Sequence, residues 1–378
     1  MAARVGAGAR SGIRRRPAVF ALGAAVVVAF AIGLIVRPLP PRAKGPSELD
    51  QVRAELVRQY YRRLSPPVLA SSSIPNLIAA LHDRYTTYLT PAEYLVARRQ
   101  FAAGYGGIGI TVRPTPDGLI VRRTWVGSVH VTAVRPGDMI LAVDGKSIKG
   151  VSYREAVGRI LGPPGTTVRL ELQRGLRTIQ VKVRRRQFES HPVHAQLVGK
   201  VGVIRISAFV QGSADETRAA VRRLRSEGAT AFAIDLRSNP GGLLDQAVET
   251  ASLFLRDGST IVSLAGAHRP LHTYYSKGDL AVSAPLAVLV NRGSASASEV
   301  VAGALKDYAR ATIIGLPTFG KSLVQQIDQL PSGAALKLTV ARYLTPAGYV
   351  ISRGGIQPDI RSRHPLVAAI AFFARRRS

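Results

Sequence analysis

The sequence predicts an α/β protein built from several domains, and three observations carry that prediction. At 378 residues, the chain exceeds the usual size of one domain. Beyond about residue 189, short apolar runs typical of buried strands alternate with segments of helical periodicity. Between residues 105 and 187, brief β-like runs are instead separated by glycine turns. We therefore expect a β-rich domain followed by a larger α/β core.

The N-terminal segment has the pattern of a membrane anchor. Residues 18–36 are uncharged and apolar, and this length can cross the hydrocarbon core of a bilayer as a helix. The basic tail 1–17 predicts a cytoplasmic N-terminus, and its prolines make 37–46 a stiff linker. A cleavable signal peptide is the alternative, but no A-x-A-like site follows the apolar stretch. We expect a single-pass anchor in the cell membrane, with the rest of the chain on the extracytoplasmic side.

Residues 47–104 form the next unit, which we predict to be helical. Apolar side chains such as Leu49, Val52, Leu56 and Tyr60 recur there at three- and four-residue spacing. The unit contains no cluster of catalytic-looking residues. We therefore expect it to serve packing or assembly.

The region 105–187 combines short strands with a glycine-rich loop. The β-like runs are 108–112, 119–121, 139–143 and 168–172, with a helical segment at 153–161. The backbone N–H groups of Gly106, Gly107, Ile108 and Gly109 precede a strand, where they can cradle a peptide carboxylate while the strand edge pairs with the peptide. With the stretch Pro136 to Gly145, this region resembles a PDZ domain, although residues 127–134 depart from the family's usual Gly-Ser-Pro-Ala pattern.

The region 188–363 alternates strands and helices, as an α/β core does. The predicted strands are 201–206, 231–236 and 286–290, the predicted helices are 215–227, 243–254 and 298–308, and 323–330 with 335–344 form a hairpin. The remaining residues, 364–378, are a basic tail. Its apolar positions fit an amphipathic membrane contact or a short helix docked on the core, and we favour the docked helix.

A run of small residues, Gly293 to Glu299, follows a predicted strand and opens a helix. The hydroxyl of Ser296 would be exposed there beside free helix N–H groups, which suits a nucleophile whose intermediate carries an oxyanion. The alternative needs no catalysis, because Ser296 and Glu299 also have the spacing of a helix capping box.

Lys321 and Gln325 form the second candidate segment. They lie four residues apart, so on a strand their side chains face the same side. A lysine acts as a base only when neutral, which requires burial to lower its pKa from about 10.4 by roughly three units. The amide of Gln325 could then orient the amine. The alternative is an ordinary lysine in solvent.

The third segment begins with the last residues of the predicted strand 231–236 and ends in a turn containing Pro240, Gly241 and Gly242. The backbone N–H of Gly241 or Gly242 could supply half of an oxyanion hole, and the N–H of Ala297 the other half. An ordinary glycine turn is the alternative.

Four motifs in this order along the chain resemble the carboxyl-terminal processing peptidase family, also called tail-specific proteases. They are 235–242 (DLRSNPGG), 294–299 (SASASE), 319–326 (FGKSLVQQ) and 344–359, within a resemblance that runs from about Leu81 to Ile360. The resemblance implies a crotonase-like protease core with an inserted PDZ domain that binds substrate C-termini and gates the active site.

The same resemblance implies roles for three residues. The family's nucleophile, base and base-orienting glutamine fall on Ser296, Lys321 and Gln325. Asp307 lies on the helix after the nucleophile, where some family members carry an acidic residue of supporting role, and we expect it to be structural. Minor departures from the family pattern occur at Ser322 and Tyr349.

Composition limits the other classes of function. Lys and Arg number 52 against 23 Asp and Glu, a formal net charge of +29, but the basic residues are scattered and no nucleic-acid-binding motif appears, so we predict no nucleic-acid partner. The absence of cysteine excludes thiolate chemistry. Neither the seven histidines nor the pair His191 and His194 predict a metal site. We expect no cofactor.

We therefore expect a membrane-anchored serine endopeptidase with a Ser-Lys dyad. It would cleave exported proteins after its PDZ domain captures an apolar C-terminal tail. The alternatives are a catalytically silent PDZ scaffold at the membrane, against which the intact Ser296, Lys321 and Gln325 argue, and a Ser-His-Asp hydrolase, although no histidine lies near the motifs in sequence. Expected partners are protein or peptide substrates with apolar C-termini and the membrane, with a homo-oligomer and an adaptor protein left open.

Overall fold

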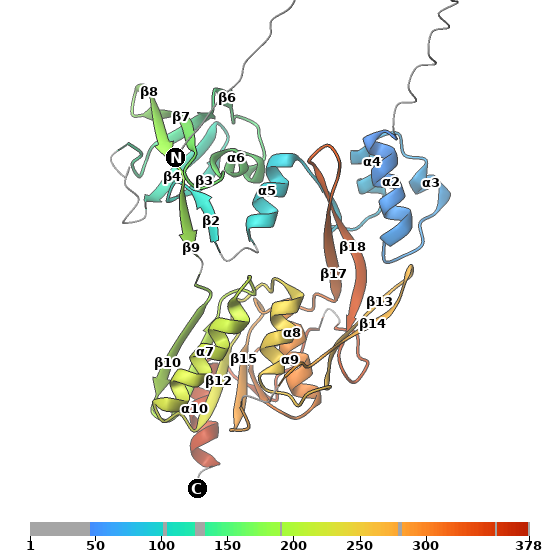
Figure 1. Cartoon of the computed structure of the whole chain (residues 1–378), viewed down its shortest axis with the longest axis vertical. Helices are drawn as coiled ribbons and strands as arrows, with labels where there is room; N and C mark the ends of the chain where they lie inside the picture. The colour runs from blue at the N-terminus through green and yellow to red at the C-terminus, as the bar shows by residue number, and fades with distance from the viewer. Residues whose placement is uncertain are drawn as a thin grey trace, which may run out of the picture. The chain divides into compact units, whose positions relative to one another are not determined.

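The computed structural model describes residues 46–100, 104–124, 133–189, 191–278, 282–351 and 354–376. Glu48 to Ser378 form one compact unit, which contains a helical N-terminal region, a β-rich domain and an α/β core in chain order (Figure 1). The prediction of a mixed α/β, multidomain fold is confirmed.

The N-terminal region is helical, as its periodicity predicts. Its elements are α2 (Glu48–Gln59), α3 (Pro66–Leu69), α4 (Ile74–Ala80), β1 (Thr87–Leu89) and α5 (Pro91–Gln100). Helix α2 buries Val52 and Leu56, two members of the predicted apolar stripe. Strand β1 differs from the prediction, because Thr87 to Leu89 pair antiparallel with a strand of the core. The helical region is thereby joined to the core by backbone hydrogen bonds.

The β-rich domain has its own sheet and its own hydrophobic core. Its strands are β2 (Gly104–Gly107), β3 (Ile110–Thr115), β4 (Gly118–Thr124), β5 (Met139–Val143), β6 (Lys146–Ser147), β7 (Thr167–Arg174), β8 (Arg177–Arg184) and β9 (Arg186–Glu189), with helix α6 (Tyr153–Ile160). Strands β3, β4, β5, β7 and β8 are neighbours in that order, while β2 pairs with β9. Ile140, Val168 and Leu172 fill the core beneath α6.

The α/β core is built on a six-stranded sheet. The strands, in spatial order, are β10 (Val193–Val198), β11 (Val201–Ile206), β12 (Ala231–Asp235), β15 (Leu286–Val290), β16 (Thr312–Gly315) and β19 (Ile360–Arg361). All neighbours from β11 onward are parallel. Parallel strands are buried on both faces, which explains why β12 and β15 are entirely buried.

Helices cover both faces of this sheet. Helices α7 (Ser213–Ser226), α8 (Leu244–Ser252) and α9 (Ala297–Asp307) share a hydrophobic cluster with one face, to which Ile204 and Ile206 of β11 contribute. Val201 and Val203 of the same strand point to the opposite face, as the two-residue period of a strand requires. The predicted C-terminal tail packs on that opposite face as helix α10 (Pro365–Arg375), through Ala369 and Phe373.

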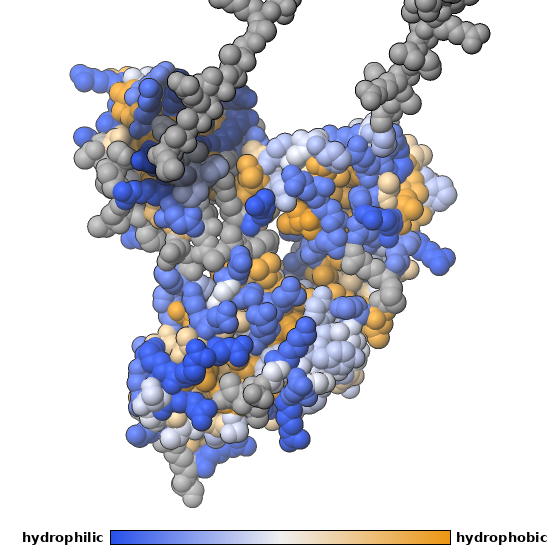
Figure 2. Space-filling model, in the orientation of Figure 1, coloured by the Kyte–Doolittle hydropathy of each residue, from blue (hydrophilic) through white to orange (hydrophobic). Residues whose placement is uncertain are grey.

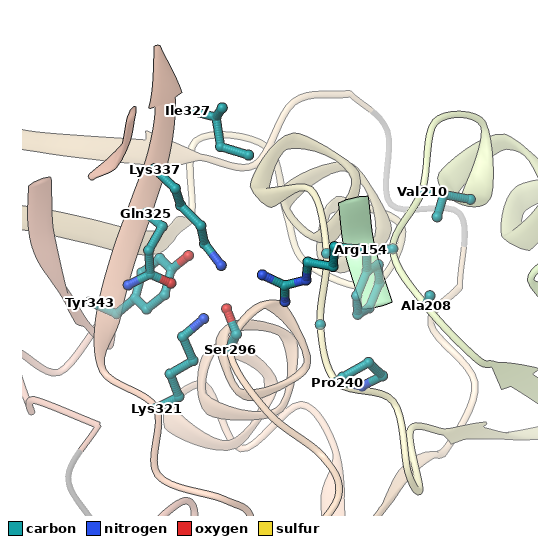
Figure 3. Close-up of a pocket in the computed structure, with 13 residues that line it drawn as sticks. Arg154, Ala208, Val210, Pro240, Ser296, Lys321, Gln325, Ile327, Lys337 and Tyr343 are labelled. Atoms are coloured by element: carbon teal, nitrogen blue, oxygen red, sulfur yellow. The ribbon is translucent and has the colours of Figure 1, made fainter. Parts of the chain in front are cut away.

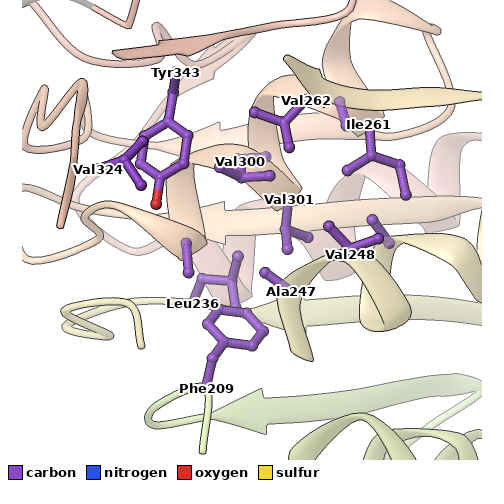
Figure 4. Close-up of a cluster of buried hydrophobic side chains, with 14 of the residues drawn as sticks. Phe209, Leu236, Ala247, Val248, Ile261, Val262, Val300, Val301, Val324 and Tyr343 are labelled. Atoms are coloured by element: carbon purple, nitrogen blue, oxygen red, sulfur yellow. The ribbon is translucent and has the colours of Figure 1, made fainter. Parts of the chain in front are cut away.

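A second sheet packs against helix α9. It contains β13 (Thr260–Gly266), β14 (Arg269–Tyr275), β17 (Leu323–Gln329) and β18 (Ala335–Leu344), together with β1. Strands β17 and β18 form the predicted hairpin. Figure 4 shows Val300 and Val301 of α9 among side chains of this second sheet, including Val324 and Tyr343. The first turn of α9 is therefore fixed by packing around it.

The surface is dominated by hydrophilic residues over most of the face shown in Figure 2, with hydrophobic residues in smaller groups between them. Large apolar side chains that are exposed, such as Leu271, Tyr349 and Val367, lie far apart in the sequence. Such single exposures are normal for a folded domain.

The prediction of a single-pass protein in the cell membrane is corrected by the structure. Within the residues described above, no helix is long and apolar enough to cross a bilayer. A span needs about 20 apolar residues, whereas the longest of the described helices, α7, has 14 and is strongly polar on one side. The stretch 18–36, on which the prediction rested, lies outside the described residues, as do 1–17 and 37–45. We assign the chain no cellular location.

The packing of α10 predicts a difference in stability between two positions of that helix. Phe373→Ala removes a buried ring that is 3% exposed, and we expect it to lower the free energy of unfolding by about 3 kcal/mol. Val367→Ala, at a position that is 67% exposed, should change it by less than about 0.5 kcal/mol. Urea denaturation followed by circular dichroism measures both. Equal effects would show that α10 does not depend on its contact with the sheet.

Candidate active site

The three segments singled out in the sequence meet at one edge of the parallel sheet. Strands β12 and β15 are parallel neighbours, so the turn after β12 and the small-residue run after β15 begin side by side. The segment before β17 approaches the same place. Ser296, Lys321, Gln325, Gly241 and Gly242 line a single cavity of about 240 Å³ (Figure 3).

Ser296 has an unusual backbone conformation at the start of α9. Its φ of 57° and ψ of −117° lie outside the regions that residues other than glycine normally occupy. Such backbone strain costs about 1–3 kcal/mol and is often found at functional sites. Hydrogen bonds from the flanking serines hold it: Ser294 Oγ donates to the Leu236 carbonyl at 2.8 Å, and Ser298 Oγ donates to the Asn239 carbonyl at 3.0 Å. The small residues of this run therefore bind the turn after β12.

Glu299 links the backbones of the two central residues of the site. Its fully buried carboxylate accepts hydrogen bonds from the N–H of Ser296 at 2.8 Å and the N–H of Lys321 at 2.9 Å. The N–H of Gly320 at 2.7 Å and the hydroxyl of Thr318 at 2.6 Å donate to the same carboxylate. The sequence indicated only a capping partner, because the residues near Lys321 are far from Glu299 along the chain.

Tyr343 is a second residue that the sequence did not single out. It projects from β18 into the cavity wall, and burial raises the pKa of its hydroxyl to about 12, although a hydrogen bond to Ser296 opposes that shift. The phenol therefore stays protonated and contacts the serine. A tyrosine within a predicted strand carries no signal of such a contact.

Lys321 lies in an environment that favours its neutral form. Burial is the largest cause that lowers the pKa of Lys321, from 10.5 to about 8, and the positive charges of Lys337 and Arg84 add to it, while Glu299 and Asp83 oppose it. Its nitrogen lies 5.1 Å from the centre of the Tyr85 ring, a contact that favours the charged form and so also opposes the shift. Figure 3 shows the amine directed toward the hydroxyl of Ser296.

Gln325 faces the same cavity from β17. Its Nε2 atom is buried and has no hydrogen-bond partner among the described residues. A buried donor without a partner costs roughly 1–3 kcal/mol. The amide is thus available to a group that enters the cavity.

The turn at Gly241 and Gly242 requires glycine at both positions. Both have positive φ, 100° and 146°, and a Cβ on Gly241 would lie 2.9 Å from both Ser296 Cβ and Ala297 N. A Cβ on Gly242 would lie 2.0 Å from the Phe209 carbonyl oxygen. The Gly241 N–H donates to Asn239 Oδ1 at 2.8 Å. The turn therefore lies in direct contact with the residues that begin α9.

The predicted carboxylate loop, Gly106 to Gly109, is not part of this cavity. Gly106 and Gly107 belong to β2, and Ile108 is buried in the core of the β-rich domain. A Cβ on Gly106 would lie 2.1 Å from the Gly162 carbonyl oxygen, so close packing requires glycine at this position. No histidine of the described residues lines the cavity that contains Ser296.

Two family models match the chain, one over the α/β core and one over the β-rich domain. Residues 200–362 match the family model "Peptidase family S41" and residues 99–173 match "PDZ domain". The chain is 37% identical over 317 residues to a probable CtpA-like serine protease of Staphylococcus aureus (strain bovine RF122 / ET3-1), covering 83% of this chain and 64% of that protein. It is 32% identical to the carboxy-terminal processing protease CtpA of Bacillus subtilis (strain 168), covering 86% of this chain and 70% of that protein.

Solved structures show the same fold. The photosystem II D1 C-terminal processing protease matches with a TM-score of 0.54 and 27% identity, covering 83% of this chain and 92% of that one. An S41 protease from Bacteroides fragilis NCTC 9343 matches with a TM-score of 0.50 and 17% identity, covering 89% and 99%. The second likeness concerns the fold alone.

The position of Glu299 predicts a large effect on stability when its carboxylate is removed. Glu299→Ala leaves four donors without their acceptor in the core, and we expect the free energy of unfolding to fall by roughly 3 kcal/mol or more. Glu249→Ala, which removes an exposed carboxylate on α8, should change it by less than about 0.5 kcal/mol. Chemical denaturation compares the two. A Glu299→Ala variant as stable as the Glu249→Ala control would contradict the role of this carboxylate.

Proposed function

The chain belongs to peptidase family S41, and from that premise we propose that it is a serine endopeptidase in which Ser296 is the nucleophile and Lys321 the general base. One observation carries this proposal: Ser296 and the partly buried Lys321 line one cavity, and the carboxylate of Glu299 holds both backbones. The chain spans 64% of the length of the Staphylococcus aureus relative described above.

The proposed reaction begins with proton transfer. Neutral Lys321 accepts the proton of the Ser296 hydroxyl as Oγ forms a bond to the carbonyl carbon of the peptide. The N–H of Gly242, with that of Ala297, stabilises the resulting oxyanion, because the N–H of Gly241 already donates to Asn239 Oδ1. Lys321 then gives its proton to the departing amine, and the C–N bond breaks. Water hydrolyses the acyl-enzyme by the same steps in reverse order.

Three further residues support this chemistry. Gln325 orients the amine of Lys321 through its side-chain amide. Tyr343 places its phenol in the cavity wall beside Ser296. Glu299 is a positioning residue, since its carboxylate holds the backbone on both sides of the dyad and does not face the cavity.

We assign substrate capture to the PDZ domain. The loop Gly106, Gly107, Ile108 and Gly109 would bind the carboxylate of an apolar C-terminal tail while the tail pairs with a strand edge. The name that the Bacillus subtilis relative carries, a carboxy-terminal processing protease, supports a substrate bound by its C-terminus. The proposed units are 47–104 for the helical region, 105–187 for the PDZ domain, 188–363 for the peptidase core and 364–378 for the C-terminal segment.

The dyad predicts that two substitutions each abolish cleavage. Ser296→Ala removes the nucleophile and Lys321→Met removes the base, so each should reduce the cleavage rate of an unfolded protein with an apolar C-terminus by at least about a thousandfold. Lys182→Met, at an exposed position of β8, serves as the control and should keep full activity. The rate is measured with the full chain by gel electrophoresis and mass spectrometry.

Two outcomes would contradict this assignment. Activity that survives in Ser296→Ala would exclude that serine as the nucleophile, and activity that survives in Lys321→Met would favour a histidine base. A folded wild-type protein that binds the tail without cleaving it would favour the PDZ scaffold.

The lowered pKa of Lys321 predicts the pH dependence of the reaction. Because the amine must be neutral, kcat/KM should rise with pH and level off above about pH 8, and it should fall about tenfold for each pH unit well below that value. Lys337→Gln removes a positive charge that lowers this pKa, so the rise should move to higher pH. A profile that levels off near pH 6.5 in both proteins would contradict a lysine base and indicate a histidine.

A further inference from the structure

The cavity that contains Ser296 has a one-sided charge. Its lining includes three basic side chains, Arg154, Lys321 and Lys337, and no aspartate or glutamate among the described residues. Figure 3 shows the Arg154 guanidinium and the Lys337 ammonium directed into the space in front of Ser296. The proposed dyad uses one of these three basic side chains, Lys321, and leaves Arg154 and Lys337 unexplained.

Lys337 is a partly buried charged residue of β18, whose other charged residue, Arg342, is exposed. It lies in β18 between Leu336 and Leu338, which are both fully buried. Burial is the largest cause that lowers its pKa, and the positive charge of Arg154 lowers it further, while Asp83 opposes both. No ion pair of Lys337 occurs among the described residues. The strand therefore holds a partly desolvated amine without a counterion.

The nearby carboxylates already have other partners. Asp83 accepts hydrogen bonds from the Thr86 hydroxyl at 2.7 Å and the Tyr85 N–H at 3.0 Å. The carboxylate of Glu299 is taken by the backbone donors around the dyad. On helix α6, Glu155 follows Arg154 directly but pairs with Arg159 at 3.1 Å. Asp83 offsets part of the positive charge at a distance, but none of these three acids forms an ion pair with Lys337 or Arg154.

Two cations that share a partly desolvated space repel each other, and an anion placed between them relieves that repulsion. Hydrogen bonds between charged groups are also stronger than neutral ones. We propose that Lys337 and Arg154 form a subsite that binds a carboxylate of the substrate close to the scissile bond. This inference rests on the proposed function, because it takes the molecule in the cavity to be a peptide.

The carboxylate can come from two sources in a peptide. One is the side chain of an aspartate or glutamate near the scissile bond, and the other is the free C-terminus of a short tail beyond it. Both present the same planar anion to an ammonium and a guanidinium. The subsite is separate from the PDZ loop at Gly106 to Gly109, which does not line this cavity.

A set of matched peptides tests the subsite. Cleavage sites in an unfolded protein are first mapped with the full chain, and peptides spanning one site are then made with Asp or Asn beside the scissile bond and with a free or amidated C-terminus. We expect at least one carboxylate to raise kcat/KM about tenfold, the effect of one charge-assisted hydrogen bond. In Lys337→Gln this ratio should fall toward one, whereas the Lys182→Gln control should keep it.

Lys337→Gln distinguishes binding at this subsite from binding at the PDZ loop, because Lys337 belongs to the peptidase core and its replacement leaves the PDZ loop intact. Arg154→Gln should reduce the ratio as well. A ratio near one in the wild type, or a ratio that Lys337→Gln leaves unchanged, would overturn the proposal.

Binding of the same peptides to Ser296→Ala tests the carboxylate subsite separately from the proposed peptidase activity. Fluorescence anisotropy measures the affinity of each labelled peptide without turnover, and the carboxylate should strengthen binding about tenfold in Ser296→Ala and not in the double variant that also carries Lys337→Gln. A wild type that cleaves nothing would refute the proposed function. The ratio of the affinities for acidic and neutral peptides would still show whether the subsite binds a carboxylate. Equal affinities for acidic and neutral peptides would overturn the subsite even where cleavage is observed.

Discussion

The arrangement of the site depends on the hydrogen bonds that the carboxylate of Glu299 accepts. It is fully buried, and it accepts hydrogen bonds from the backbone of Ser296 and from the segment that ends at Lys321. A buried carboxylate is stable only when such donors surround it. Its position therefore fixes the distance between two chain segments that belong to different sheets. The same contacts place the proposed nucleophile and base on one cavity.

The rest of the fold supplies the rigid frame around this carboxylate. Helix α9 is buried between the parallel sheet and the sheet of β17 and β18, so its first turn cannot shift without disturbing both. That rigidity maintains the strained backbone of Ser296. It also buries Lys321 enough to lower the pKa of its amine. The packing and the proposed chemistry thus have a common physical origin.

The sequence predicted those parts whose signal is local. The strand 286–290, the small-residue run after it and the Lys321–Gln325 spacing each lie within a few residues, and the motif order carried the family resemblance. No local sequence signal marks Tyr343 or Lys337, because their positions in the site depend on the register of β18 against the rest of the core. Arg154 comes from another domain, so no local pattern could place it. The anchor prediction rested on hydropathy alone, and the described residues contain no such span.

If Lys321 activates Ser296 for attack on a peptide carbonyl, an acyl-enzyme forms on Ser296 during turnover. This intermediate can be trapped by acid quenching and located by mass spectrometry of the digested protein. We expect an acyl group on the peptide that contains Ser296, present in the wild type and absent in Lys321→Met. An acyl group on another residue, or one that forms at the same rate in Lys321→Met, would contradict it.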